Sequence, residues 1–295
     1  MNNKKRSGAA SPELEMRIGS ELRDIGIPPR PDILTRIDAE MRKEEPDYRR
    51  LGEAIGSDVS LSASIIKVSN SPYFGLGRRV RSVPEALLVL GLKTAIQTIA
   101  GIALQRAFPH VPSLERFWDS AACTARVSGW LVRRLQDQTR LRPDDGYTFG
   151  LFRDCGIPVL MIPFPEYREI LGRANNEAER SFTAVEDELL SINHASVGAE
   201  LAQDWLLPED TCQAMRHHHD VSVIAGTETS GVSLAARQLV AFGQIAEHLI
   251  QRTTGMNQTR EWEKLGPVCL RLLGISADDL ATLESEAGPV IESGD

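Results

Sequence analysis

The feature that most constrains the fold is the spacing of apolar residues, which recur at helical intervals along most of the chain. Ile33, Leu34, Ile37 and Met41 follow one another in this way, and Pro46 ends their run. No stretch alternates β-branched and polar residues for long enough to predict a sheet. The sequence therefore predicts an all-α protein.

Prolines, glycines and capping residues divide the chain into separate helices, with Ser57-Asp58 and the capping box beginning at Ser82 as expected N-terminal caps. Three prolines keep residues 27–31 extended, because proline fixes φ and lacks an amide donor. Gly91 is expected to end one helix in the left-handed region. Residues 142–146 and 221–231 are expected to be loops. The predicted helices cover residues 11–26, 33–45, 48–56, 58–69, 82–91, 92–108, 114–135, 164–174, 181–205, 209–220, 232–252 and 261–273.

At 295 residues, the chain is long enough for two domains. Pro109 and Pro112 mark the expected border between them. We divide the sequence into a flexible tail (1–10), an N-terminal helical lobe (11–110), a second helical lobe (111–275) and a C-terminal helix with an acidic tail (276–295).

The net charge of −8 and the isoelectric point near 5.4 argue against broad binding to nucleic acid or to an anionic membrane. The four cysteines have no C-x-x-C spacing, and the N-terminal residues lack the apolar core of a signal peptide. We therefore expect reduced thiols and a cytoplasmic protein. The longest apolar stretch, Ile157–Phe164, is broken by prolines and is far shorter than the ~20 residues that span a bilayer, so no membrane segment is expected.

A charged pair, Arg153-Asp154, interrupts an otherwise apolar run. An unpartnered carboxylate there would cost several kcal/mol, so Asp154 needs a partner. It is a structural ion pair, a cap, a metal ligand or a general base. The candidate site residues are Asp154, His194, His218, His219 and Asp220, whose imidazoles and carboxylates suit zinc, iron, manganese or nickel. The competing interpretation of the histidines at 217–219 is an exposed helix C-terminus.

Other chemistries find little support. The sequence contains no G-x-S-x-G, P-loop, G-x-G-x-x-G or H-E-x-x-H motif. Arg78, Arg79 and Arg81 could bind phosphate or nucleic acid, but a solvated loop is the more common meaning of such a group, and we treat it as surface.

Several segments together resemble the HDOD family, signalling-output domains related to the HD metal-dependent phosphohydrolases. The resemblance covers about residues 20–220 and implies a two-lobed helical fold whose C-terminal lobe is HD-like. It is carried by residues 27–31, 55–61, 68–74, 83–87 with 90–91, 117–118, 150–156, 194–199, 205–208 and 218–220.

Carried over position by position, the resemblance implies a degenerate HD centre. Ser120 stands at the early histidine, and Arg153-Asp154 stands at the His-Asp pair. His194 and His218 or His219 remain, followed by Asp220. In the helix expected to supply the last aspartate, residues 239–249, Glu247 is the only carboxylate.

These departures predict a centre without metal, cofactor or catalysis. Arg153 brings a permanent cation to the position of a neutral ligand, so we expect Asp154 to be buried and paired with Arg153 or His194. If a metal is held, its ligands are Asp154, His194, His218 and His219. No Gly-Tyr-Pro follows His219-Asp220, which argues against the cyclic-dinucleotide phosphodiesterase branch.

The sequence therefore predicts a non-catalytic regulatory module, such as a response-regulator output, in a bacterial signalling pathway. We expect it to bind a small ligand or a protein partner, for example a two-component or cyclic-dinucleotide pathway component, and not nucleic acid or a membrane. The candidate partner surface comprises Asn70, Tyr73, Phe74, Arg78, Arg79 and Arg81; a structural role at a helix corner stays open for Asn70, Tyr73 and Phe74. The alternative function is a residual metal-dependent phosphohydrolase acting on a nucleotide or cyclic dinucleotide.

Overall fold

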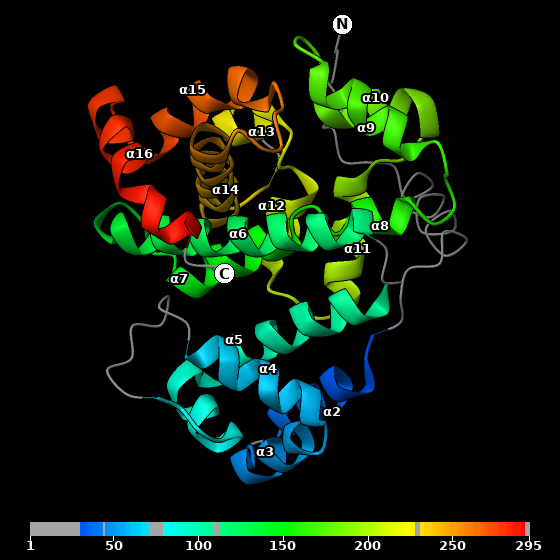
Figure 1. The fold of residues 1–295 in the computed structure, drawn as a ribbon, viewed down its shortest axis with the longest axis vertical. Helices are drawn as coiled ribbons and strands as arrows, with labels where there is room; N and C mark the ends of the chain where they lie inside the picture. The colour runs from blue at the N-terminus through cyan, green and yellow to red at the C-terminus, as the bar shows by residue number, and fades with distance from the viewer. Residues whose placement is uncertain (1–29, 44, 71–78, 109–111, 228–230, 293–295) are drawn as a thin grey trace, which may run out of the picture.

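Helices joined by turns make up the described part of the chain, which is residues 30–43, 45–70, 79–108, 112–227 and 231–292 of a computed structural model (Figure 1). No strand occurs among these residues, and the predicted all-α class is confirmed. The expected tail (1–10) and first helix (11–26) lie outside the described residues.

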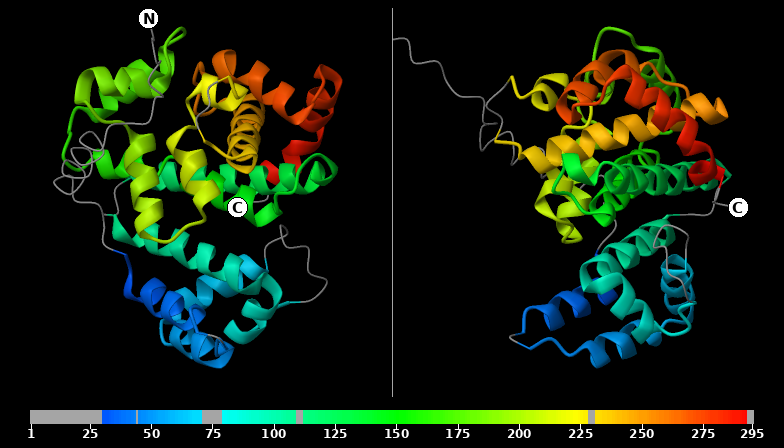
Figure 2. Two further views of the ribbon diagram at one scale, coloured as in Figure 1. Left: turned by 180° about the vertical axis from the view of Figure 1, so that it is seen from behind. Right: turned by 90° about the vertical axis from the view of Figure 1, so that its left-hand side faces the viewer.

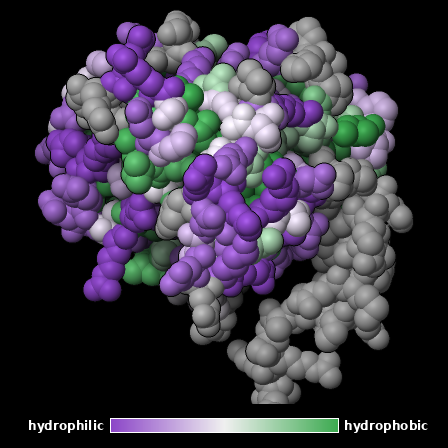
Figure 3. All heavy atoms as spheres, turned by 90° about the horizontal axis from the view of Figure 1, so that it is seen from below, coloured by the Kyte–Doolittle hydropathy of each residue, from purple (hydrophilic) through white to green (hydrophobic). Residues whose placement is uncertain are grey.

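The N-terminal lobe, at the bottom of Figure 1, is built from α2 (Asp32–Met41), α3 (Tyr48–Gly56), α4 (Val59–Ser69) and α5 (Val83–Ala107). Asp58 and Ser82 cap α4 and α5 as the sequence predicts, because their side chains accept hydrogen bonds from backbone amides of the first turn. Ile55 and Ile65 are fully buried between these helices. Seen from below, the described part of this face is mostly hydrophilic (Figure 3).

Gly91 divides α5 into two segments. Its φ of 69° is positive as predicted, but its ψ of 161° lies outside the left-handed helical region, so the chain bends and continues as a helix. Among the described helices, α5 is the one long and apolar enough to cross a membrane, and 61% of its most apolar window is buried inside the protein. Such burial is typical of a core helix.

The second lobe, at the top of Figure 1, contains the remaining helices. In chain order these are α6 (Pro112–Arg134), α7 (Pro143–Phe152), α8 (Gly156–Leu160), α9 (Tyr167–Asn176), α10 (Phe182–Leu190), α11 (His194–Asp204), α12 (Glu209–Arg216), α13 (Val221–Ala225), α14 (Leu234–Thr254), α15 (Glu261–Leu273) and α16 (Ala277–Glu292). Helices α6, α7, α12, α13, α15 and α16 pack against α14, and α8–α11 pack on one another beside them. A short 3₁₀ helix, Gln136–Gln138, follows α6.

The predicted loop at residues 142–146 is wrong, because α7 begins at Pro143. Proline suits the first position of a helix, and the Asp145 carboxylate accepts a hydrogen bond from the backbone amide of Arg142 at 2.9 Å. The loop predicted at residues 221–231 is also partly wrong, since Asp220 caps the short helix α13.

The single helix predicted over residues 181–205 is in fact two helices. Ser191 adopts a left-handed conformation with φ of 59° and ends α10. Asn193 then caps α11 by accepting a hydrogen bond from the Ser196 amide at 2.9 Å. The break turns the start of α11 toward the interior of the lobe.

The lobes meet where the second segment of α5 packs against α7 (Figures 1 and 2). Thr94 donates a hydrogen bond to Asp144 at 2.7 Å, and Lys93 pairs with Asp145 at 2.7 Å. Further along, a Cβ at Gly101 would lie 2.4 Å from Leu151 Cδ2, so a side chain there would require Leu151 to move. These contacts fix α7 against the N-terminal lobe.

Candidate functional site

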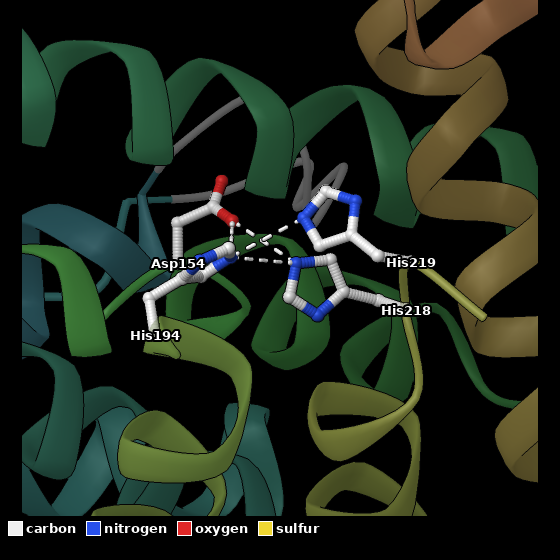
Figure 4. Close-up of side chains that lie close together, drawn as sticks. All are labelled: Asp154, His194, His218 and His219. Atoms are coloured by element: carbon white, nitrogen blue, oxygen red, sulfur yellow. Dashed lines mark hydrogen bonds and ion pairs between the residues drawn. The ribbon is translucent and has the colours of Figure 1, made fainter. Parts of the chain in front are cut away.

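Asp154, His194, His218 and His219 converge inside the second lobe, although they come from three separate parts of the chain (Figure 4). Asp154 lies in the turn between α7 and α8, His194 begins α11, and His218 and His219 follow α12. Each residue supplies one nitrogen or oxygen atom to a group in which all atoms lie within 4.8 Å of one another. The fold therefore joins four of the predicted site residues.

Gly156 brings Asp154 and His194 together. A Cβ at Gly156 would lie 2.1 Å from the His194 carbonyl oxygen, so the absence of a side chain allows the start of α8 to touch α11. The Asn193 cap fixes His194 as the first residue of α11 on the other side of this contact.

Two buried acids orient two of the imidazoles. Nδ1 of His194 lies 2.7 Å from Glu186 Oε2, and Nδ1 of His219 lies 2.6 Å from Glu261 Oε2. The Tyr167 hydroxyl donates a hydrogen bond to the other oxygen of Glu186. Because a carboxylate oxygen accepts hydrogen bonds, we assign each Nδ1 as the donor, and each Nε2 is then directed into the cluster.

The backbone orients His218 in the same way, since its Nδ1 donates to the Met215 carbonyl oxygen at 2.6 Å. As a result, Nε2 of His194 lies 3.2 Å from Nε2 of His218 and 3.3 Å from Nε2 of His219. Three nitrogen lone pairs at these distances repel one another unless a cation, either a proton or a metal ion, lies among them.

The four side chains could together hold a single metal ion, since several of their ligand atoms are spaced as in a metal site while the whole set lies within 4.8 Å. Oδ1 of Asp154 lies 3.3 Å from Nε2 of His218 and 3.6 Å from Nε2 of His194. In a tetrahedral zinc site with metal–nitrogen distances of about 2.0–2.1 Å, neighbouring ligand atoms are about 3.3–3.4 Å apart. Three imidazoles and one carboxylate favour a transition metal such as zinc or cobalt over magnesium, which prefers oxygen ligands.

In the metal-free protein the cluster holds a proton instead. Burial lowers the pKa of His194, but Glu186 and Asp154 outweigh this effect and raise the pKa to about 10. Burial and the neighbouring His219 lower the pKa of His218 to about 3. Burial also lowers the pKa of His219. His194 is therefore cationic near neutral pH, and the other two imidazoles are neutral.

Arg153 fills the space between two carboxylates. Its side chain is 3% exposed; Nε lies 3.2 Å from Asp154 Oδ2, and a terminal nitrogen lies 3.2 Å from Glu247 Oε2. Burial raises the pKa of Asp154, but the Arg153 guanidinium and the imidazoles outweigh this and hold it well below its ordinary value. Asp154 is thus paired with both Arg153 and His194, and its side chain is 29% exposed rather than fully buried.

A cleft with a volume of about 320 Å³ leads to the cluster. Asp154, His194 and His219 line it, together with Arg153, Glu247 and Glu261. The other walls combine apolar side chains, among them Phe117 and Phe182, with the polar residues Arg116, Ser120, Thr124, Asn175, Asn257 and Thr259. A small molecule with an apolar and a polar part could therefore reach the cluster.

Two other residues of the predicted degenerate site lie apart from the four-residue cluster. Ser120 lines the cleft, and its hydroxyl accepts a hydrogen bond from Asn257 at 2.7 Å. Asp220 instead caps α13, where its carboxylate accepts hydrogen bonds from the backbone amides of Ser222 and Val223.

The structure describes three of the six residues of the candidate partner surface: Asn70, Arg79 and Arg81. Asn70 exchanges two hydrogen bonds of 2.8 Å with the backbone of Val80, which indicates a structural role. Arg79 and Arg81 are exposed. The other members, Tyr73, Phe74 and Arg78, lie outside the described residues.

Sequence reasoning missed Glu186 and Glu261, the acids that orient His194 and His219. Glu186 lies in an acidic run that indicates the start of a helix, and Glu261 is expected only as the first residue of another. No spacing rule links either acid to its histidine, because the two members of each pair lie in different elements of the fold. The sequence carries no signal that would have identified Glu186 or Glu261.

The sequence matches known proteins over most of its length. The HDOD domain family profile matches residues 27–221. An uncharacterized protein of Treponema pallidum (strain Nichols) is 27% identical over 198 residues, which are 66% of this chain and 38% of that protein. The protein YuxH of Bacillus subtilis (strain 168) is 38% identical over 52 residues, which are 18% of this chain and 13% of YuxH. The chain thus spans well under half of these curated relatives.

Solved structures share the fold across both lobes. A candidate phosphohydrolase from Shewanella amazonensis SB2B has a TM-score of 0.66 and 20% identity, covering 94% of this chain and 96% of that one. An HDOD domain protein from Geobacter sulfurreducens has a TM-score of 0.64 and 23% identity, covering 95% and 97%. A candidate signal transduction protein from Marinobacter aquaeolei VT8 has a TM-score of 0.59 and 22% identity, covering 92% and 60%. With the family profile matched over most of both lobes, the chain belongs to the HDOD domain family.

Proposed function

We propose that the chain is a non-catalytic regulatory module that transmits a signal by binding a protein partner or a small ligand. The observation that supports this proposal is the position of Arg153. A permanent cation stands where the HD pattern has a neutral histidine, and it forms ion pairs with both Asp154 and Glu247. Carboxylates engaged in this way are poorly placed to hold or activate a water molecule. The likeness to the candidate signal transduction protein of Marinobacter aquaeolei agrees with such a role.

A hydrolysis assay tests the proposal. The full chain is incubated with zinc, manganese or cobalt and with bis(4-nitrophenyl) phosphate or a cyclic dinucleotide, in parallel with the Asp154→Ala and His194→Ala variants. We expect the wild-type protein to be no faster than either variant. Metal-dependent turnover that both substitutions abolish would overturn the non-catalytic role.

The second candidate function is a residual metal-dependent phosphohydrolase, which the ligand spacing and the adjoining cleft favour. Asp154, His194, His218 and His219 would hold the ion, which when bound supplies Lewis acidity and lowers the pKa of a coordinated water. Arg116 on the cleft wall offers a positive charge to an anionic substrate. Elemental analysis alongside the hydrolysis assay separates the two functions: bound metal without turnover supports a regulatory site, and bound metal with turnover supports the enzyme.

Binding of a protein partner is tested on the exposed part of the N-terminal lobe. A two-component or cyclic-dinucleotide pathway protein is the expected partner. Affinity capture from the native cell with the wild-type chain is compared with an Arg79→Glu/Arg81→Glu variant and with an Arg49→Glu control, whose side chain is 88% exposed elsewhere on the same lobe. We expect the double variant alone to lose the partner. Equal capture by all three proteins would place the partner surface elsewhere.

A further inference from the structure

The Asp154 carboxylate faces two different cation positions. Its Oδ1 is directed at the imidazole cluster, 3.3 Å from Nε2 of His218. Its Oδ2 is directed at Arg153, whose Nε lies 3.2 Å away. One carboxylate therefore bridges the pocket that fits a metal ion and a guanidinium that is permanently charged.

The second cation position is already filled by Arg153. Beyond Asp154, its guanidinium reaches Glu247 Oε2 at 3.2 Å and donates to the Gly243 carbonyl oxygen at 3.5 Å. Two acids and a carbonyl oxygen around one buried charge are the ligand types that a second divalent ion would use. A metal ion at this position would have to displace the guanidinium or lie directly beside it, where like charges repel in a poorly solvated environment.

We propose that Arg153 takes the place of a second metal ion and limits the centre to one divalent transition-metal ion, held by Asp154, His194, His218 and His219. This inference goes beyond the proposed function, because it concerns how many ions the centre accepts and not whether it hydrolyses a substrate. It also gives Arg153 a positioning role. By pairing with Oδ2 of Asp154, the arginine orients the carboxylate so that Oδ1 faces the histidines.

Metal stoichiometry tests the inference directly. The full chain is stripped with a chelator and dialysed against increasing concentrations of zinc or cobalt, and bound ions per chain are measured by elemental analysis. We expect wild-type protein to saturate at one ion and His194→Ala to lose it. Saturation at two ions, or no bound ion in the wild-type protein, would overturn the inference.

Substitutions of Arg153 identify the cause of the limit. Arg153→His removes the charge and supplies an imidazole, so the variant is expected to bind two ions. Arg153→Met frees the two carboxylates without adding a ligand, so this variant is expected to bind a second ion more weakly than Arg153→His. If Arg153→His does not fold, the number of ions bound by Arg153→Met tests the same point. Arg153→Lys keeps a cation and is the matched control, which should stay at one ion.

The inference fails if the folded charge-removing variants, checked by circular dichroism, also stop at one ion. Hydrolysis measured on the same samples keeps the two conclusions separate. In the wild-type protein, one bound ion with turnover would contradict the proposed function and leave this inference standing. Two bound ions without turnover would contradict this inference and leave the proposed function standing.

Discussion

The structure predicts that removing the buried charge of Arg153 destabilises the protein in a pH-dependent way. In Arg153→Met, Asp154 keeps its contacts with His194 and His218, but Glu247 loses its cation. Glu247 is 20% exposed, and burial already raises its pKa from the ordinary value of 4.5, although Arg153 opposes the rise. Without Arg153, we expect Glu247 to take up a proton rather than remain buried and charged.

The free energy needed to protonate Glu247 sets the size of the stability loss in Arg153→Met. Protonating a carboxyl group whose pKa in the unfolded chain is 4.5 costs about 3.4 kcal/mol at pH 7 and about 0.7 kcal/mol at pH 5. The sign follows because a carboxyl whose pKa is raised by folding binds protons that the unfolded chain has released, so lower pH favours the folded variant. We therefore expect Arg153→Met to lose about 3 kcal/mol at pH 7 and about 1 kcal/mol at pH 5.

Urea unfolding at the two pH values measures this difference. The control is Arg49→Met, which removes an 88% exposed partner of Glu53 and should change stability by less than about 0.5 kcal/mol at either pH. A loss below about 1 kcal/mol at pH 7, or an equal loss at both pH values, would show that Arg153 does not neutralise a buried Glu247.

Three further predictions concern other parts of the chain. Gly156→Ala should cost at least about 2 kcal/mol in urea unfolding, because the new Cβ would lie 2.1 Å from the His194 carbonyl oxygen. The control Gly172→Ala, at an exposed helix position where the new Cβ meets nothing within 4 Å, should gain up to about 1 kcal/mol. The raised pKa of His194, about 10 against an ordinary 6.5, gives stability that is complete below pH 6.5 and is lost as the pH rises toward 10. The metal-free protein should therefore lose up to about 1.4 kcal/mol per pH unit between pH 7.5 and 9, and His194→Gln should flatten this slope; parallel slopes would contradict the assignment. Asn70→Ala should lower the free energy of unfolding by about 2–3 kcal/mol, because it breaks two 2.8 Å hydrogen bonds to the partly buried backbone of Val80. The control Asn176→Ala, at an exposed position, should lower it by less than about 0.5 kcal/mol. If Asn70→Ala left stability unchanged but abolished binding of a protein partner, Asn70 would be an interface residue.

Local signals predicted the N-terminal helices well. Asp58 and Ser82 are caps whose partners lie within one helical turn, so the sequence contains the whole interaction. The split between α10 and α11 was missed, because the left-handed Ser191 is not a glycine and the apolar spacing continues across the break.

The candidate site was predictable in membership but not in geometry. Asp154, His194, His218 and His219 were chosen by residue type and by the HDOD resemblance, and the structure brings all four together. The imidazoles face one another because of their Nδ1 partners: Glu186 and Glu261 lie in other elements than their histidines, whereas His218 donates to the Met215 carbonyl oxygen three residues before it. The two acids follow no spacing rule, so the sequence does not reveal that the four side chains could hold a metal ion.

The helix α7 gives the molecule a physical link of known length. Its 10 residues form a rod about 15 Å long, whose first turn is bonded to the N-terminal lobe through Thr94 and Lys93. The two residues that follow its other end are Arg153 and Asp154. One helix about 15 Å long therefore connects the contact between the lobes with the charged pair at the edge of the histidine cluster.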